Sequence, residues 1–95
     1  MVYILRNIKS DNIFMKSIDE VNTYLLAEVA KIKSLPVESV TLESHILYDL
    51  YFDSVDLIDL LTSIEYDLHV VIDDDELDKF TTLASVSQTI LRFSK

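Results

Sequence analysis

The stretch that decides the fold is DSVDLIDLLTSIEYDL, residues 53–68. Asp53 is suited to cap a helix, because its short side chain can accept a hydrogen bond from a free N–H of the first turn. At 100° per residue, the large apolar side chains of a helix from Ser54 to about Leu68 fall on one side. They are Leu57, Leu60, Leu61, Ile64 and Leu68. The pattern predicts an amphipathic helix whose apolar side faces a core.

The opposite side of this helix is acidic and partly apolar. A side that only contacts water does not ordinarily present Val, Ile and Tyr beside carboxylates, so the pattern favours a partner-binding surface. The alternative is a face whose acids simply keep a small domain in solution. The residues on this side and along its flanks are Val55, Asp56, Ile58, Asp59, Thr62, Glu65 and Tyr66.

Two further helices have local start signals. Ser17 and Glu20 are spaced as a capping box, in which each side chain bonds the backbone N–H of the other residue, and the helix that starts there should end before Pro36. Thr81 and Thr82 can cap a last helix. Apolar residues recur at spacings of three and four in both helices, which predicts buried stripes. The stripes are Ile18, Val21, Leu25, Val29 and Ile32 in the first helix and Leu83, Val86, Ile90 and Phe93 in the last.

The segments between these helices complete an all-α fold. A short helix is expected from Asp73 to about Lys79, because acids in its opening turn meet the positive end of the helix dipole. The absence of Gly and the single Pro argue against Gly-rich hairpins, so we expect a small bundle of three longer helices and one short helix. Residues 34–50 form a long loop that should pack over the core through apolar members. These are Val37, Val40, Leu42, Ile46, Leu47 and Leu50.

Charge is unevenly distributed along the 95 residues, whose formal net charge is −9. Thirteen acidic residues lie between Glu38 and Asp78, a span without Lys or Arg. Such a surface repels phosphate backbones, which excludes nucleic acid as a partner, and it suits proteins with basic patches. The chain is long enough for one core, and it has neither an apolar run that could cross a bilayer nor a secretory signal. We therefore expect a soluble cytoplasmic monomer.

The sequence offers little support for catalysis or metal binding. A serine nucleophile needs a base beside it, and the only histidines, His45 and His69, both lie more than eight residues from Ser54. The acids from Asp73 to Glu76 lack the alternating ligands and the glycine of an EF-hand loop. Because the chain has no cysteine, any thiol must be supplied by another group. We expect a non-catalytic protein.

The position of Ser54 at a helix start suggests a different role. The free N–H groups and positive dipole end favour a phosphate on the serine oxygen and offset repulsion from neighbouring aspartates. Here the sequence resembles the acyl carrier protein family, whose signature, Asp-Leu-Gly-x-Asp-Ser-Leu, opens the second helix. The matching segment is DLYFDSVD, residues 49–56. The likeness extends over roughly residues 16–93 and includes KFTTL at residues 79–83, which is similar to the family's Lys-Ile-Thr-Thr-Val.

The resemblance implies the four-helix fold of acyl carriers and a covalent cofactor. Ser54 would receive 4'-phosphopantetheine from coenzyme A through a magnesium-dependent phosphopantetheinyl transferase, and Asp53 would belong to the attachment motif. The arm would present acyl groups, held as thioesters, to acyl-transferring enzymes of fatty acid or related lipid biosynthesis. The positions that match partner-contacting ones are Val55, Asp56, Ile58 and Asp59. The alternative function is an unmodified acidic helical adaptor that binds basic proteins.

Three positions depart from the family pattern. Tyr51 replaces the usual glycine, and because positive φ and close packing are both costly for tyrosine, we expect the loop to take another path or to bury the ring. Thr62 and Tyr66 stand where methionine and glutamate are frequent, which predicts a shifted partner specificity. The segment DLYFDSVDLIDL, residues 49–60, is similar to specialised carriers encoded beside type III secretion systems, which keep a tyrosine there.

The start of the chain has no counterpart in the resemblance. Met15 opens a segment that is similar to an ordinary carrier N-terminus. We therefore expect residues 1–15 to be a flexible extension, with translation able to start at Met15, and residues 16–95 to be the acyl carrier domain.

Overall fold

The computed structural model describes residues 17–94, which form helices joined by loops, with no strand among them. One isolated antiparallel bridge pairs His45 with Thr82. The prediction of an all-α bundle with three longer helices and one short one is confirmed, and one further single turn, η2, interrupts the predicted loop. The elements are α1 (Ile18–Lys33), η2 (Val37–Ser39), α2 (Ser54–Leu68), η3 (Asp74–Lys79) and α3 (Leu83–Phe93).

Local capping sets the ends of α1. The Ser17 hydroxyl accepts from the Glu20 N–H at 3.2 Å, and the Glu20 carboxylate accepts from the Ser17 N–H at 3.0 Å, as the capping box predicted. At the other end Ser34 takes a left-handed conformation with φ 56°, and the Leu35 N–H bonds the Ala30 carbonyl at 2.9 Å. This αL ending satisfies carbonyls that the helix leaves open, so α1 stops before Pro36.

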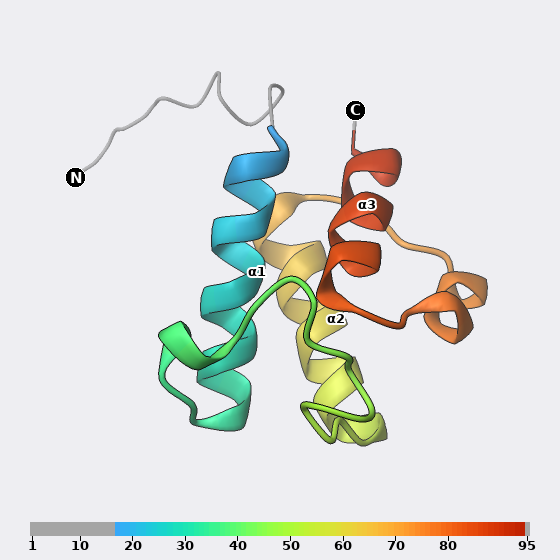
Figure 1. Cartoon of the computed structure of the whole chain (residues 1–95). Coiled ribbons are helices and arrows are strands. Elements are labelled where there is room, and N and C mark those ends of the chain that lie inside the picture. The colour runs from blue at the N-terminus through green and yellow to red at the C-terminus, as the bar shows by residue number, and fades with distance from the viewer. Residues whose placement is uncertain (1–16, 95) are drawn as a thin grey trace.

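The core lies between the three longer helices, with α1 packed against both α2 and α3 (Figure 1). Most stripe residues are buried as predicted, but Ile18 is exposed because it is the first residue of α1, at the end of the bundle. The fully buried side chains of the three helices are Val21, Leu25, Val29, Leu60, Ile64, Leu83, Val86, Ser87 and Ile90.

The long loop from α1 to α2 is tied to the start of α3. The N–H of Ile46 bonds the carbonyl of Thr81 at 2.8 Å, and the N–H of Leu83 bonds the carbonyl of Ser44 at 3.1 Å. Val40, Ile46 and Leu50 are buried and Leu42 is partly buried, which confirms that the loop packs over the core. The prediction was wrong for Val37 and Leu47, which are exposed. Leu47 lies in a tight turn, in which its backbone N–H donates to Nδ1 of His45 at 3.1 Å.

The last two sequence predictions concern the N-terminal extension and membrane-spanning segments. The extension over residues 1–15 and a start at Met15 lie outside the described residues. Within residues 17–94, none of the helices has both the length and the apolar character needed to cross a membrane.

Candidate functional site

The site begins at the capping box that opens α2. Asp53 is the N-cap, and its carboxylate accepts from the Asp56 N–H at 2.8 Å. The Asp56 carboxylate accepts in return from the Asp53 N–H at 3.2 Å. The cap at Asp53 was predicted, whereas the reciprocal bond from Asp56 was not, although an acid three residues after an N-cap is the signal for it. The pair fixes the backbone on both sides of Ser54.

Ser54 is the first residue of α2, and it is exposed. Within the part of the chain that the structure describes, the backbone N–H groups of Ser54 and Val55 have no hydrogen-bond partner, while those of Asp56 and Leu57 bond Asp53. Two free donors therefore lie beside the serine hydroxyl, at the positive end of a helix of 15 residues. Their placement suits a phosphate group on the serine oxygen.

Lys33, the last residue of α1, contacts the same turn, and sequence reasoning missed it. Its Nζ lies 2.8 Å from Asp56 Oδ2 and donates to the Tyr51 carbonyl at 3.2 Å. The ammonium also lies 5.6 Å from the centre of the Phe52 ring, within the range of a cation–π contact. The hydrogen bond from Lys33 is the largest of the effects that lower the pKa of Asp56 below its usual value. Asp56 is thus an anionic side chain with an intramolecular partner.

Tyr51 corrects one expectation. Its backbone adopts φ 56°, in the left-handed region that glycine would favour, and its side chain projects into solvent with the residue 76% exposed. The loop neither takes another path nor buries the ring. Contacts on both sides hold this conformation in place, because Leu50 and Phe52 are buried and Lys33 bonds the Tyr51 carbonyl.

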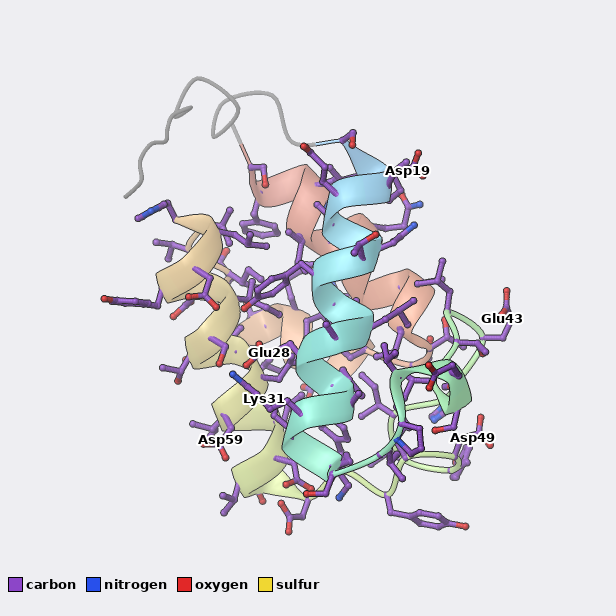
Figure 2. The ribbon with its side chains drawn as sticks, turned by 90° about the vertical axis from the view of Figure 1, so that its left-hand side faces the viewer. Asp19, Glu28, Lys31, Glu43, Asp49 and Asp59 are labelled. Atoms are coloured by element: carbon purple, nitrogen blue, oxygen red, sulfur yellow. The ribbon has the colours of Figure 1, made fainter. Side chains whose placement is uncertain are left out.

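The outer face of α2 presents its apolar and acidic side chains together, as predicted. Val55 is 67% exposed and Ile58 is 58% exposed, and Asp59, the residue after Ile58, is also exposed. Figure 2 shows Asp59 pointing away from α1 and the core. Asp56 differs from these three, because only 19% of its side chain is exposed. The four predicted partner-contacting positions therefore divide into three open side chains and one engaged side chain.

The two histidines lie where the backbone changes direction, His45 in the loop before α2 and His69 at the end of α2. His45 Nδ1 accepts from the N–H groups of Leu47 and Tyr48 at 3.1 and 3.3 Å, and its ring stacks on Tyr48 with centroids 4.3 Å apart. His69 ends α2 in a left-handed conformation with φ 57°. His45 therefore has a local structural role that the sequence alone did not specify.

Known proteins resemble this chain over most of its length. A family described as "Phosphopantetheine attachment site" matches residues 23–90. The chain is also 30% identical over 76 residues to the acyl carrier protein of Rickettsia canadensis (strain McKiel), a match that covers 80% of this chain and 88% of that protein. The acyl carrier protein of Rickettsia rickettsii (strain Iowa) matches with the same identity and coverage.

The chain belongs to the acyl carrier protein family.

Membership of this acyl carrier family brings 4'-phosphopantetheine as the covalent cofactor, and the first turn of α2 fits it. The turn combines an exposed hydroxyl on Ser54 with two free amides, and Lys33 lowers the repulsion that Asp56 would exert on a phosphate. When bound, the arm supplies the thiol that the chain itself lacks. The narrower resemblance to carriers encoded beside type III secretion systems stays a prediction.

Proposed function

We propose that this acyl carrier protein holds acyl groups as thioesters on a 4'-phosphopantetheine arm joined to Ser54 Oγ. The observation that supports this position most strongly is the exposed hydroxyl at the first residue of α2, beside the N–H groups of Ser54 and Val55, which have no partner among residues 17–94. A phosphodiester there would be stabilised by the helix dipole and by charge-assisted hydrogen bonds from these amides.

The chain's own residues would serve as acceptor and scaffold in the attachment reaction. The Ser54 oxygen loses its proton and forms a bond to phosphorus, while the bond to the nucleotide half of coenzyme A breaks. Asp53 and Asp56 bond each other's amides and Asp56 also binds Lys33, so both carboxylates have a structural role in the turn. We assign the base to the transferase, and the carrier then contributes position rather than catalysis.

Partner enzymes would meet the outer face of α2. Val55 and Ile58 offer exposed apolar contacts, and Asp59 offers an exposed carboxylate one turn after Val55. Basic patches on a phosphopantetheinyl transferase and on acyl-transferring enzymes complement this arrangement. Asp53 contributes through the cap and Asp56 chiefly through the fold of the turn. We propose a cytoplasmic monomer that serves fatty acid or related lipid biosynthesis.

The test is transfer of the arm in vitro. The purified protein is incubated with coenzyme A, Mg²⁺ and a promiscuous phosphopantetheinyl transferase, and its intact mass is measured. The wild type should gain one arm, Ser54→Ala should gain none, and Ser63→Ala, a second serine change within α2, should behave as the wild type. Because the chain has no cysteine, a thiol-reactive label should react only after modification, once per chain.

The alternative function is that of an unmodified acidic adaptor for basic proteins. It is compatible with the exposed Val55, Ile58 and Tyr66 on an acidic face. A wild-type protein that keeps its mass and remains unlabelled would favour the adaptor.

A further inference from the structure

The turn that carries Ser54 is held against α1 through one ammonium group. Lys33 is the C-terminal residue of α1, and its Nζ reaches the Tyr51 carbonyl, the Phe52 ring and the Asp56 carboxylate. The first two partners lie in the last residues of the loop before α2, and the third lies in the first turn of α2. We name Lys33 and these three partners the Lys33 clamp.

The clamp differs from an ordinary surface ion pair in its burial. Only 23% of the Lys33 side chain and 19% of the Asp56 side chain are exposed, and their charged atoms are 2.8 Å apart. Lys31, two residues earlier on α1, pairs with Glu28 at 3.5 Å and has a side chain that is 75% exposed. A pair shielded from water is screened less by salt and restricts its partners more than an exposed pair does.

The clamp supports two features of the turn: the left-handed conformation of Tyr51 and the capping box around Ser54. The Tyr51 carbonyl belongs to a residue in a left-handed conformation, which is costly for tyrosine, and Lys33 is its hydrogen-bond donor. Asp56 Oδ2 accepts from both Lys33 and the Asp53 N–H, so the ion pair also orients the carboxylate that completes the capping box around Ser54. Loss of the ammonium would free the turn at both points.

The clamp also changes which charges a partner meets. Asp56 directs its carboxylate to Lys33, whereas Asp59, one turn further along α2, is exposed. Removing Lys33 would release a second carboxylate toward the partner, which by itself would strengthen the attraction of a basic enzyme. Loss of position and gain of charge therefore act in opposite directions on the transfer reaction.

We propose that Lys33 is a positioning residue for attachment of the arm: it fixes the first turn of α2 so that the Ser54 hydroxyl is presented in one orientation, and it withdraws Asp56 from the partner-binding charge. This inference rests on the proposed function, because it concerns the rate at which Ser54 is modified. It adds a residue on α1 to a site that otherwise lies on α2 and the preceding loop.

The test compares Lys33→Met with Lys31→Met. Both variants change the net charge from −9 to −10, and both remove one ion pair made by the last turn of α1. Steady-state arm transfer should show kcat for Lys33→Met lowered by at least about fivefold, since a displaced reacting group loses catalytic geometry. Its KM should be unchanged or lower, and Lys31→Met should keep the wild-type kcat. A general loss of fold would not lower kcat while leaving KM unchanged or lower.

Three further variants separate position from charge. Lys33→Arg should recover most of kcat, because the guanidinium group is also a cation and can donate the hydrogen bonds that the lysine ammonium makes. Asp56→Asn should also lower kcat, because it removes the partner of Lys33 in the ion pair. Adding Lys33→Met to Asp56→Asn should lower kcat little further, since the pair is already lost. Amide hydrogen exchange should quicken at residues 51–57 in Lys33→Met and not in α3, which gives a readout even if transfer is slow.

The outcomes distinguish this inference from the proposed function. A folded Lys33→Met with wild-type kcat and unchanged exchange would overturn the clamp, while Ser54 would remain the attachment site. Equal kcat losses in Lys33→Met and Lys31→Met would also overturn it, because the effect would then be one of net charge. A wild-type protein that accepts no arm would overturn the proposed function, and the role of Lys33 with it.

Discussion

Tyr51 occupies a backbone conformation that its side chain does not favour. The left-handed region costs a residue with a β-carbon about 1–2 kcal/mol relative to glycine, and the exposed Tyr51 ring gains little burial in return. The sequence revealed the departure from glycine but not its outcome. The outcome depends on Lys33, Leu50 and Phe52, whose contacts with the turn are tertiary.

Replacement of Tyr51 by glycine should therefore stabilise the protein. We expect the free energy of unfolding to rise by about 1 kcal/mol, since relief of the left-handed strain exceeds the added flexibility of the unfolded chain. Urea denaturation measures the change. Tyr48→Gly is the control, because Tyr48 is also exposed but has no positive φ, and it should give no gain. A destabilised Tyr51→Gly would show that the ring makes contacts that its exposure conceals.

The Lys33–Asp56 pair makes a prediction about pH. Lys33 lowers the pKa of Asp56 in the folded protein, so the stabilisation from the pair is complete above the ordinary value of 3.8 and is lost as pH falls through the folded-state value. Lys33→Met should be less stable than the wild type at pH 7, and the difference should narrow in strong acid to what the contacts of Lys33 with Tyr51 and Phe52 contribute. Denaturation midpoints from pH 7 to pH 2 test this, and a constant difference across that range would contradict it.

At the scale of elements, the sequence predicted the helix starts, which depend on neighbouring residues, but not the contacts between helices. The bounds of α1, α2 and α3 were predictable because Ser17, Asp53 and Thr82 cap helices within their own segments. The Lys33 clamp joins residues 23 positions apart, and the Tyr24–Asp67 hydrogen bond joins residues 43 positions apart. Neither pair leaves a periodic trace in a single sequence, so the packing of α1 against α2 had to come from the structure.

The contact between Tyr24 and Asp67 should contribute measurably to the docking of α1 on α2. The phenol donates to Asp67 Oδ2 at 2.7 Å, and partial burial together with this bond raises the pKa of Tyr24 above its usual value. Tyr24→Phe should lower the free energy of unfolding by about 1 kcal/mol, the net value of a typical hydrogen bond. The control is Tyr66→Phe on α2, whose side chain is 81% exposed. Equal effects of the two changes would exclude a specific contribution from the bond.

The outer face of α2 makes a prediction about partner encounter. Asp59→Lys should raise the KM of arm transfer by about threefold or more, because an exposed carboxylate at the interface acts mainly on association. Asp56→Lys should slow transfer too, and it should also lower stability because the capping box loses the Asp56 carboxylate. Glu43→Lys has the same change of net charge on another side of the molecule (Figure 2) and should leave KM near the wild-type value. A KM indifferent to Asp59→Lys would remove α2 from the recognition surface.

At the scale of the whole molecule, acidic charge is the dominant feature. Of the thirteen acids between Glu38 and Asp78, Glu43 and Asp49 lie on one side of the molecule and Asp59 on the opposite side (Figure 2). Within residues 17–94, no group of three or more His, Cys, Asp or Glu side chains is arranged to hold a metal ion. In the acid-rich η3, Glu76 forms ion pairs with Lys79 and with Arg92 of α3, which link η3 to α3.

Cations should stabilise the protein by screening the repulsion among its carboxylates. We expect Ca²⁺, Mg²⁺ or moderate salt to raise the melting temperature by roughly 4 °C, as for about 1 kcal/mol in a domain of this size. The rise should be gradual with concentration and similar for the two divalent ions. Calorimetry measures it. A melting temperature that does not respond to any of these cations would mean that the acids are too dispersed to repel one another appreciably.

The central claim concerns one oxygen atom, and peptide mapping tests it most directly. The wild-type protein is modified with coenzyme A and a phosphopantetheinyl transferase, digested, and fragmented in a mass spectrometer to locate the arm. The account predicts the arm on Ser54 in every modified molecule, next to the amides that open α2. An arm found on any other serine, or a chain that stays unmodified under conditions that modify a known carrier, would contradict it.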